Sequence, residues 1–136
     1  MNPRYYDILL ELNFNKMYFI LGNHDKRKKL QNLIDEYELN IEIFNNLIIE
    51  VENKQYYLIH YPYKCSDEMP SIVGHVHNLY KKLNVGDKVS TYLRSEKKTY
   101  EKILKYPILN VGIDVCDYKP ISLRECINIL GDKNEN

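Results

Sequence analysis

Apolar positions in the first third of the chain predict a short helix, a strand and a longer helix. Residues 17–21 form a compact apolar run of strand length. The longer helix is predicted from four apolar residues that would share one face: Leu30, Leu33, Ile34 and Tyr37. Before the strand, Tyr6, Leu9 and Leu10 trace a short helix that we expect to end near Asn13.

The middle of the chain predicts a β-hairpin followed by single strands. Residues 47–51 and 55–59 are strand-like runs separated by three polar residues, which is typical of a hairpin. Residues 71–73 form a short strand candidate and residues 108–115 a longer one. Between them, residues 78–106 are charged and weakly periodic, which indicates a long excursion of loop that can include a hairpin.

The end of the chain predicts a second helix. Ser122 and Glu125 have the spacing of a capping box, and Gly131 would close the helix. Strand and helix signals therefore alternate, which predicts the α/β or α+β class with helices layered on sheet. With 136 residues, of which 44% are hydrophobic, the chain can fill one core, so we expect a single domain over residues 1–136.

The charge balance and the cysteine content indicate which partners and which cellular compartment the sequence favours. Nineteen basic residues balance nineteen acidic ones, so no global field draws the protein to nucleic acid or to an anionic membrane. The apolar runs are far shorter than a membrane span, and the N-terminus has no signal-peptide core. The three cysteines, Cys65, Cys116 and Cys126, are odd in number and irregularly spaced, which favours reduced thiols and a cytoplasmic protein.

The histidines are the strongest chemical signal in the sequence. All four follow predicted strands or lie within three residues of a glycine: His24, His60, His75 and His77. The carboxyl ends of strands are where ligand sites collect in layered sheet proteins, and imidazole is the commonest metal-binding side chain. Asn23 adds an amide oxygen, which favours Mn, Fe or Zn, while Gly22 and Gly74 would let the backbone turn tightly.

Two other interpretations compete with a catalytic metal site. A single histidine near an apolar strand is more often a hydrogen-bonded structural residue than a ligand, although four such placements together are harder to explain in that way. A structural zinc site is the second, with four ligands that suit tetrahedral geometry: His60, Cys65, His75 and His77. It would leave the segment from Gly22 to Asp25 unexplained.

These motifs resemble, in order, the third, fourth and fifth motifs of the calcineurin-like metallophosphoesterases. They are Gly-Asn-His-Asp at 22–25, the histidine of Leu-Ile-His-Tyr-Pro at 60, and Gly-His-Val-His at 74–77. Residues 110–115 and 118–123 also resemble the closing segment of small bacterial and phage members. The resemblance implies a two-sheet sandwich flanked by helices, with metal ions at the strand ends.

The resemblance also implies roles for these residues. Asn23, His60 and His75 would bind one divalent ion and His77 a second, with Mn, Fe or Zn as the metal. In the family, a metal-activated water attacks phosphorus, and His24 would be the acid that stabilises the leaving group. Asp25 would orient His24 through a hydrogen bond, or would cap the helix that follows it.

The family's first two motifs, Asp-x-His and Gly-Asp, are absent from this sequence, although they should precede residue 5. In the family these two motifs supply ligands of one metal and the carboxylate that bridges both ions. Four carboxylates of this chain lie nearest by motif position, but none is a convincing replacement: Asp67, Glu68, Asp114 and Asp117. We therefore expect an N-terminally incomplete domain that lacks the first strands and binds one ion tightly. Its open sheet edge favours a homo-oligomer or a complementary N-terminal fragment as partner.

Two functions follow from these features. The first is a metal-dependent phosphoester hydrolase, a phosphatase or phosphodiesterase, for which nucleic acid enters only as a possible substrate. The alternative is an inactive binding or scaffold module with the same fold. Retained histidines favour the enzyme, whereas the absent bridging carboxylate favours inactivity of this chain alone. Four cations at 26–29 lie where a helix should begin, a position that disfavours positive charge. They are explained either by a phosphate that binds nearby or by simple exposure to solvent.

Overall fold

The computed structural model describes residues 5–76, 79–112 and 115–131. It combines helices with several β-sheets, so the predicted α+β class is confirmed. In the described part of the chain the strands form three sheets, with two, five and two strands. None of the described helices is long and apolar enough to cross a membrane.

The first part of the chain forms a small β-α-β unit. The 3₁₀ helix η1 (Tyr5–Leu10) is followed by β1 (Met17–Ile20), α1 (Arg27–Tyr37) and β2 (Ile41–Phe44). Strands β1 and β2 are parallel, which requires the crossover that α1 provides. The apolar face of α1 packs with η1 on this sheet, around five buried residues: Tyr6, Leu9, Leu30, Ile34 and Ile41.

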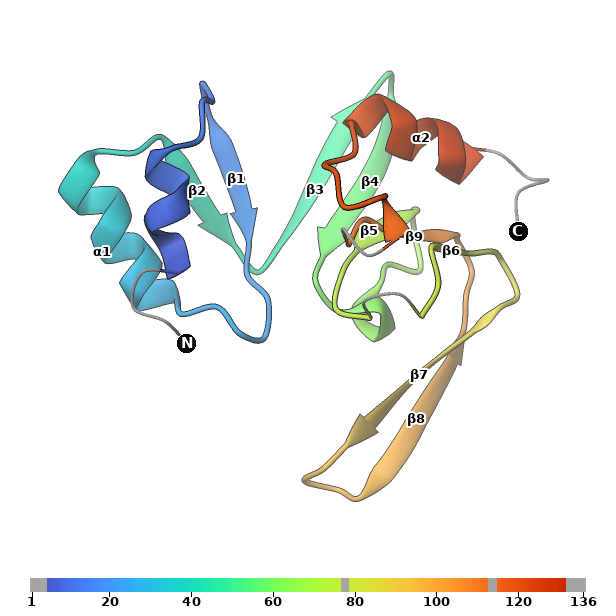
Figure 1. Ribbon diagram of the computed structural model, residues 1–136. Coiled ribbons are helices and arrows are strands. Elements are labelled where there is room, and N and C mark those ends of the chain that lie inside the picture. The colour runs from blue at the N-terminus through green and yellow to red at the C-terminus, as the bar shows by residue number, and fades with distance from the viewer. Residues whose placement is uncertain (1–4, 77–78, 113–114, 132–136) are drawn as a thin grey trace.

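A five-stranded sheet forms the larger part of the molecule. Its order is β3 (Asn46–Val51), β4 (Lys54–Ile59), β5 (Ser71–Val73), β9 (Ile108–Asn110) and β6 (Lys82–Leu83). Strands β3 and β4 are antiparallel, whereas the β4–β5 and β5–β9 pairs are parallel. Figure 1 shows helix α2 (Leu123–Gly131) against this sheet.

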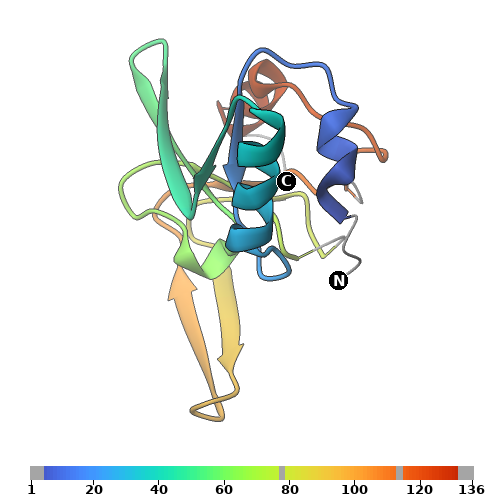
Figure 2. The same ribbon diagram turned by 90° about the vertical axis from the view of Figure 1, so that its left-hand side faces the viewer.

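Both faces of the five-stranded sheet are covered. On one face α2 buries Cys126 and Leu130 against Ile72 and Leu109. On the other face a second cluster contains six buried residues: Ile59, Cys65, Val73, Val89, Leu104 and Ile108. This second cluster joins the sheet to the short helix η2 (Pro62–Lys64) and to the hairpin of β7 (Lys88–Leu93) and β8 (Lys98–Ile103). The hairpin extends away from the sheet in both views (Figures 1 and 2).

Most locally encoded elements agree with the sequence predictions. The β3–β4 hairpin turns at Glu52 and Asn53, whose φ angles of 52° and 66° match the two-residue turn that suits twisted strands. Ser122 caps α2 as predicted, because its hydroxyl accepts a hydrogen bond from the Glu125 N–H group at 3.1 Å. The excursion at 78–106 contains the β7–β8 hairpin.

Three elements differ from the predictions. Strand β2 was not predicted, because Ile41–Phe44 is only four residues long and lies close to a helix end. The first helix is a 3₁₀ helix that ends at Leu10. The strand predicted over residues 108–115 ends at Asn110, whose side-chain oxygen accepts the Gly112 N–H group at 2.9 Å and diverts the chain.

Candidate metal centre

The strand ends bring two of the predicted ligands to one edge of the larger sheet. His60 follows β4, and His75 follows β5 after Gly74. Strands β4 and β5 are parallel neighbours, paired at Tyr57–Ser71 and Leu58–Ile72. Their carboxyl ends therefore lie side by side, and the Gly74 N–H group donates to the His60 carbonyl at 3.0 Å. The two imidazoles are adjacent because of this pairing.

Asn23 reaches the same point from the end of β1. Its Oδ1 atom lies 2.9 Å from His60 Nε2, and His75 Nδ1 lies 3.2 Å from the same nitrogen. Metal bonds of about 2.0–2.2 Å place neighbouring donor atoms about 3 Å apart, so this spacing fits one shared ion. Each of these three atoms can offer a lone pair to a metal, and a single cation could bind all three at once.

Both glycines of the site make room for the His60 ring. A Cβ atom at Gly22 would lie 3.0 Å from His60 Cε1, and one at Gly74 would lie 3.3 Å from His60 Nδ1. Each glycine begins a turn as predicted, because the Gly22 carbonyl accepts the Asp25 N–H group at 3.2 Å and the Gly74 carbonyl accepts the Val76 N–H group at 2.8 Å. Neither has a positive φ, so the left-handed freedom of glycine is not used. The requirement at these positions is space, because the imidazole lies against the backbone on both sides.

The unusual backbone conformation in the site belongs to His75. Its φ angle is 70°, in the left-handed region that L residues seldom adopt. It is the central residue of a three-residue turn in which the Val76 N–H group donates to the Gly74 carbonyl at 2.8 Å. Strain of this kind collects at ligand sites, and here it directs the His75 ring towards His60.

Tyr61 packs against both imidazoles. Its ring centroid is 5.0 Å from that of His60 and 5.0 Å from that of His75, and the two imidazole centroids are also 5.0 Å apart. Sequence reasoning missed this residue. The only signal was an aromatic side chain next to a histidine, which is common in a chain with 13 tyrosines.

Asp25 holds the loop that presents Asn23. Its carboxylate accepts the Gly22 N–H group at 2.7 Å and the Tyr6 hydroxyl at 3.2 Å. The Tyr6 oxygen in turn accepts the Lys26 N–H group at 2.7 Å, so a buried tyrosine of η1 ties the loop to the start of α1. Tyr6 is therefore a positioning residue that the sequence gave no reason to select.

This arrangement differs from both roles expected of Asp25. Lys26 is the residue at the N-cap of α1 and has no side-chain cap bond, so the helix-cap interpretation is wrong. Within the described residues, the carboxylate is bonded to Gly22 and Tyr6 rather than to the ring of His24. His24 is exposed beside Asn23. Lys26, with Arg27 and the lysines at 28 and 29, is exposed at the start of α1.

The remaining predicted ligands have separate outcomes. His77 and Asp114 lie outside the described residues. Cys65 is buried in the apolar cluster below η2, and this burial raises the pKa of its thiol, which disfavours the thiolate that zinc requires. In the parts of the chain that the structure describes, no group of three or more His, Cys, Asp or Glu side chains is placed to hold a metal ion. The candidate centre thus rests on two imidazoles and one amide.

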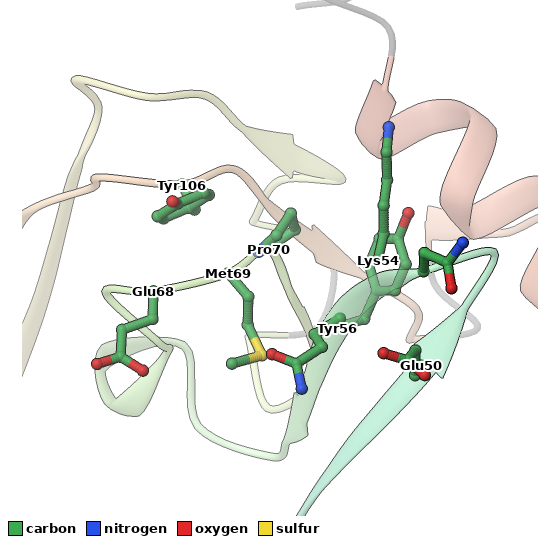
Figure 3. Close-up of a pocket in the computed structure, with 9 residues that line it drawn as sticks. Glu50, Lys54, Tyr56, Glu68, Met69, Pro70 and Tyr106 are labelled. Atoms are coloured by element: carbon green, nitrogen blue, oxygen red, sulfur yellow. The ribbon is translucent and has the colours of Figure 1, made fainter.

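Two cavities differ in their relation to the histidines. A cavity of about 250 Å³ adjoins His60 and is mostly apolar, with Ile20 of β1 facing Ile72 and Val111. A larger cavity of about 530 Å³ lies around the opposite end of β4, where Tyr56, Met69 and Tyr106 line it (Figure 3). Among the described residues, no histidine lines the larger cavity, so its size does not mark the candidate centre.

Comparisons with known proteins address the fold only. Neither the protein-family profiles nor the curated proteins contain a match to this chain. Among solved structures, the chain is similar to AQ665 from Aquifex aeolicus, which is described as a protein of unknown function. The identity is 23% and the TM-score is 0.55, with 94% of this chain and 69% of that chain covered. The similarity shows a shared fold.

Proposed function

We propose that this protein is a metal-dependent phosphoester hydrolase that binds one divalent ion through Asn23, His60 and His75. One observation carries the proposal: the donor atoms of these residues converge at 2.9 and 3.2 Å from three separate strand ends. The resemblance of the three motifs to calcineurin-like metallophosphoesterases supplies the reaction class. The donor set suits Mn, Fe or Zn.

The exposure of the site supports access for a phosphoester. Asn23 and His75 are exposed and His60 is half-buried, so the open side of the three donors faces solvent. A divalent ion held there would supply Lewis acidity towards a phosphoryl oxygen and towards water. Three protein ligands leave positions free for both, which is the arrangement of catalytic rather than structural zinc sites.

His24 is the residue that we assign to proton transfer. It follows Asn23 directly and is exposed, so its ring can reach a substrate held beside the three donors. An imidazole gains and loses a proton near neutral pH, which suits donation to a departing oxygen. Asp25 contributes by closing the loop through Gly22, and the exposed cations at the start of α1 add positive charge near the same loop.

A second ion and its bridging carboxylate would have to come from elsewhere. Within the described residues β1 pairs only with β2, and the apolar cavity of about 250 Å³ lies between Ile20 and the larger sheet. An added strand could pair with the free side of β1 and place a carboxylate beside His60. We therefore propose a second copy of this chain, or a complementary fragment, as the partner that completes the site.

The alternative function is an inactive binding or scaffold module. It is favoured by the lack of a three-membered cluster of His, Cys, Asp or Glu among the residues described. Hydrolysis by this chain together with the partner that completes the site would support the first function, and its absence there would support the second. The three free cysteines, two of them buried, support a cytoplasmic location for either function.

Metal titration by calorimetry tests the proposed centre directly. We expect Mn²⁺ or Zn²⁺ to bind the wild-type protein, and His75→Gln to weaken binding by at least about tenfold because one of three ligands is lost. His24→Gln is the matched control, since it removes an adjacent exposed imidazole that holds no metal in this proposal. Equal metal affinity in both variants would show that the convergence of these side chains is structural.

A further inference from the structure

The β7–β8 hairpin, with its turn and the residues up to 105, is called the hairpin arm. Its base is firmly attached: Val89 is 5% exposed within the core cluster, and Lys102 Nζ donates to the Cys65 carbonyl at 2.9 Å. Lys102 also lies 3.8 Å from Asp67. The rest of the arm extends away from the sheet (Figures 1 and 2). The base therefore holds a projecting ribbon in a defined direction.

The projecting part exposes large apolar side chains on both faces. The pairing places Tyr92 opposite Thr99 on one face and Leu93 opposite Lys98 on the other. Tyr92, near the tip, is 58% exposed, and Ile103, on the same face but at the base of the arm, is 55% exposed. A two-stranded ribbon is marginally stable alone in water, so such a surface is typical of one that meets a partner.

The charge of the arm indicates the chemistry of that partner. Residues 88–105 contain six basic and two acidic side chains, in a chain whose formal net charge is zero. Lys88 pairs with Glu101 and Lys102 with Asp67, whereas Arg94, Lys97 and Lys98 at the tip are exposed and form no ion pair with the described carboxylates. A partner that matches this surface carries repeated negative charge.

The tyrosines near these cations indicate which class of negatively charged partner fits the arm. Lys98 Nζ lies 5.2 Å from the centroid of the Tyr100 ring on one face of the ribbon. Tyr92 is exposed on the other face, two residues before Arg94 at the tip. Cations that contact phosphates, alternating with aromatic rings that stack on bases, are the means by which proteins bind single-stranded nucleic acid. A duplex would offer the phosphates, but its bases are already stacked on one another.

We propose that the hairpin arm binds single-stranded nucleic acid, with Arg94, Lys97 and Lys98 on phosphates and Tyr92 stacked on a base. The inference stands apart from the metal centre. If the proposed hydrolase function is correct, binding by the arm indicates that nucleic acid is the substrate class of that hydrolase.

Fluorescence anisotropy with labelled single-stranded oligonucleotides, about a dozen nucleotides long and in EDTA, tests the arm without hydrolysis. We expect the triple variant Arg94→Glu/Lys97→Glu/Lys98→Glu to weaken binding at least tenfold, and Tyr92→Ala to weaken it about tenfold. The matched control reverses three exposed lysines outside the arm, as Lys54→Glu/Lys81→Glu/Lys119→Glu, and should bind more tightly than the arm variant. Raising salt from about 50 to about 200 mM should weaken wild-type binding about tenfold or more.

Three results would overturn the proposal: no binding at low salt, equal losses in the two triple variants, or tighter binding to duplex than to single strands. Circular dichroism verifies that each variant is folded, and Tyr92→Ala, which changes no charge, tests the stacking role if a triple variant unfolds. His75→Gln should bind the oligonucleotide like the wild type. The arm and the metal centre can therefore fail independently.

Discussion

His75 Nδ1 lies 3.2 Å from His60 Nε2, although the two residues are 15 positions apart in the chain. Parallel pairing of β4 with β5 brings them together, and the left-handed turn at His75 directs its ring towards His60. A hydrogen bond between these two nitrogens requires a proton on one of them, whereas a metal ion needs the lone pairs of both. Metal and protons therefore compete for this pair, and we expect metal affinity to be retained at high pH and lost as the pH falls.

The first prediction concerns stoichiometry. The purified protein should hold at most one divalent transition-metal ion tightly per chain, because only Asn23, His60 and His75 converge among the residues described. Elemental analysis after dialysis measures this value. Two tightly held ions per chain in a monomeric sample would mean that carboxylates not recognised here complete a binuclear site.

The second prediction concerns the space around His60. Gly22→Ala should lower metal affinity at least about tenfold, because the new Cβ would lie 3.0 Å from His60 Cε1 and would displace the ring. Gly131→Ala is the matched control, since a Cβ there meets no atom within 4 Å. Calorimetric titration compares the two variants. Unchanged affinity in Gly22→Ala would show that the ring position does not govern metal binding.

The third prediction concerns activity. Hydrolysis of a generic aryl phosphate by this chain in Mn²⁺ should be weak or undetectable, because no bridging carboxylate is placed beside the three ligands among the described residues. A chromogenic assay with wild type and His75→Ala measures it. Robust turnover that His75→Ala abolishes would show that the site is already complete.

The fourth prediction concerns Tyr6, which is 5% exposed and bonds to both Asp25 and the Lys26 N–H group. Tyr6→Phe should lower the free energy of unfolding by about 1–3 kcal/mol, because the partly buried Lys26 N–H group loses its acceptor and the Asp25 carboxylate loses one of its two donors. Tyr37→Phe is the control at a 52% exposed site on α1, where we expect little change. Urea denaturation measures both, and equal losses would contradict the role assigned to Tyr6.

The fifth prediction concerns self-association. The free side of β1 and the apolar cavity beside Ile20 favour pairing with a second copy, so the apparent mass should rise above 16.3 kDa with concentration. Ile20→Lys should reduce this association by placing a charge in the cavity. Analytical ultracentrifugation over a wide concentration range measures it. A stable monomer at high concentration would rule out the proposed homo-oligomer.

Local sequence patterns predicted most of the helices and strands and indicated the candidate ligands. The apolar stripe of α1, the turn at Glu52 and Asn53 and the cap at Ser122 each depend on residues within a few positions of one another. Such patterns act through neighbouring side chains, so they can be recognised without knowledge of the fold. The positions of His60 and His75 after strands were predictable for the same reason.

Only the tertiary structure decided how these pieces meet. The pairing of β4 with β5, the approach of Asn23 to His60 and the contact of Tyr61 with both imidazoles join residues distant in sequence. Their register depends on burial of both sheet faces, to which every strand contributes and which no local pattern encodes. The partner of Asp25 shows the same limit. The sequence suggested a hydrogen bond between Asp25 and the neighbouring His24, whereas the packing of η1 on α1 places the Tyr6 hydroxyl against that carboxylate.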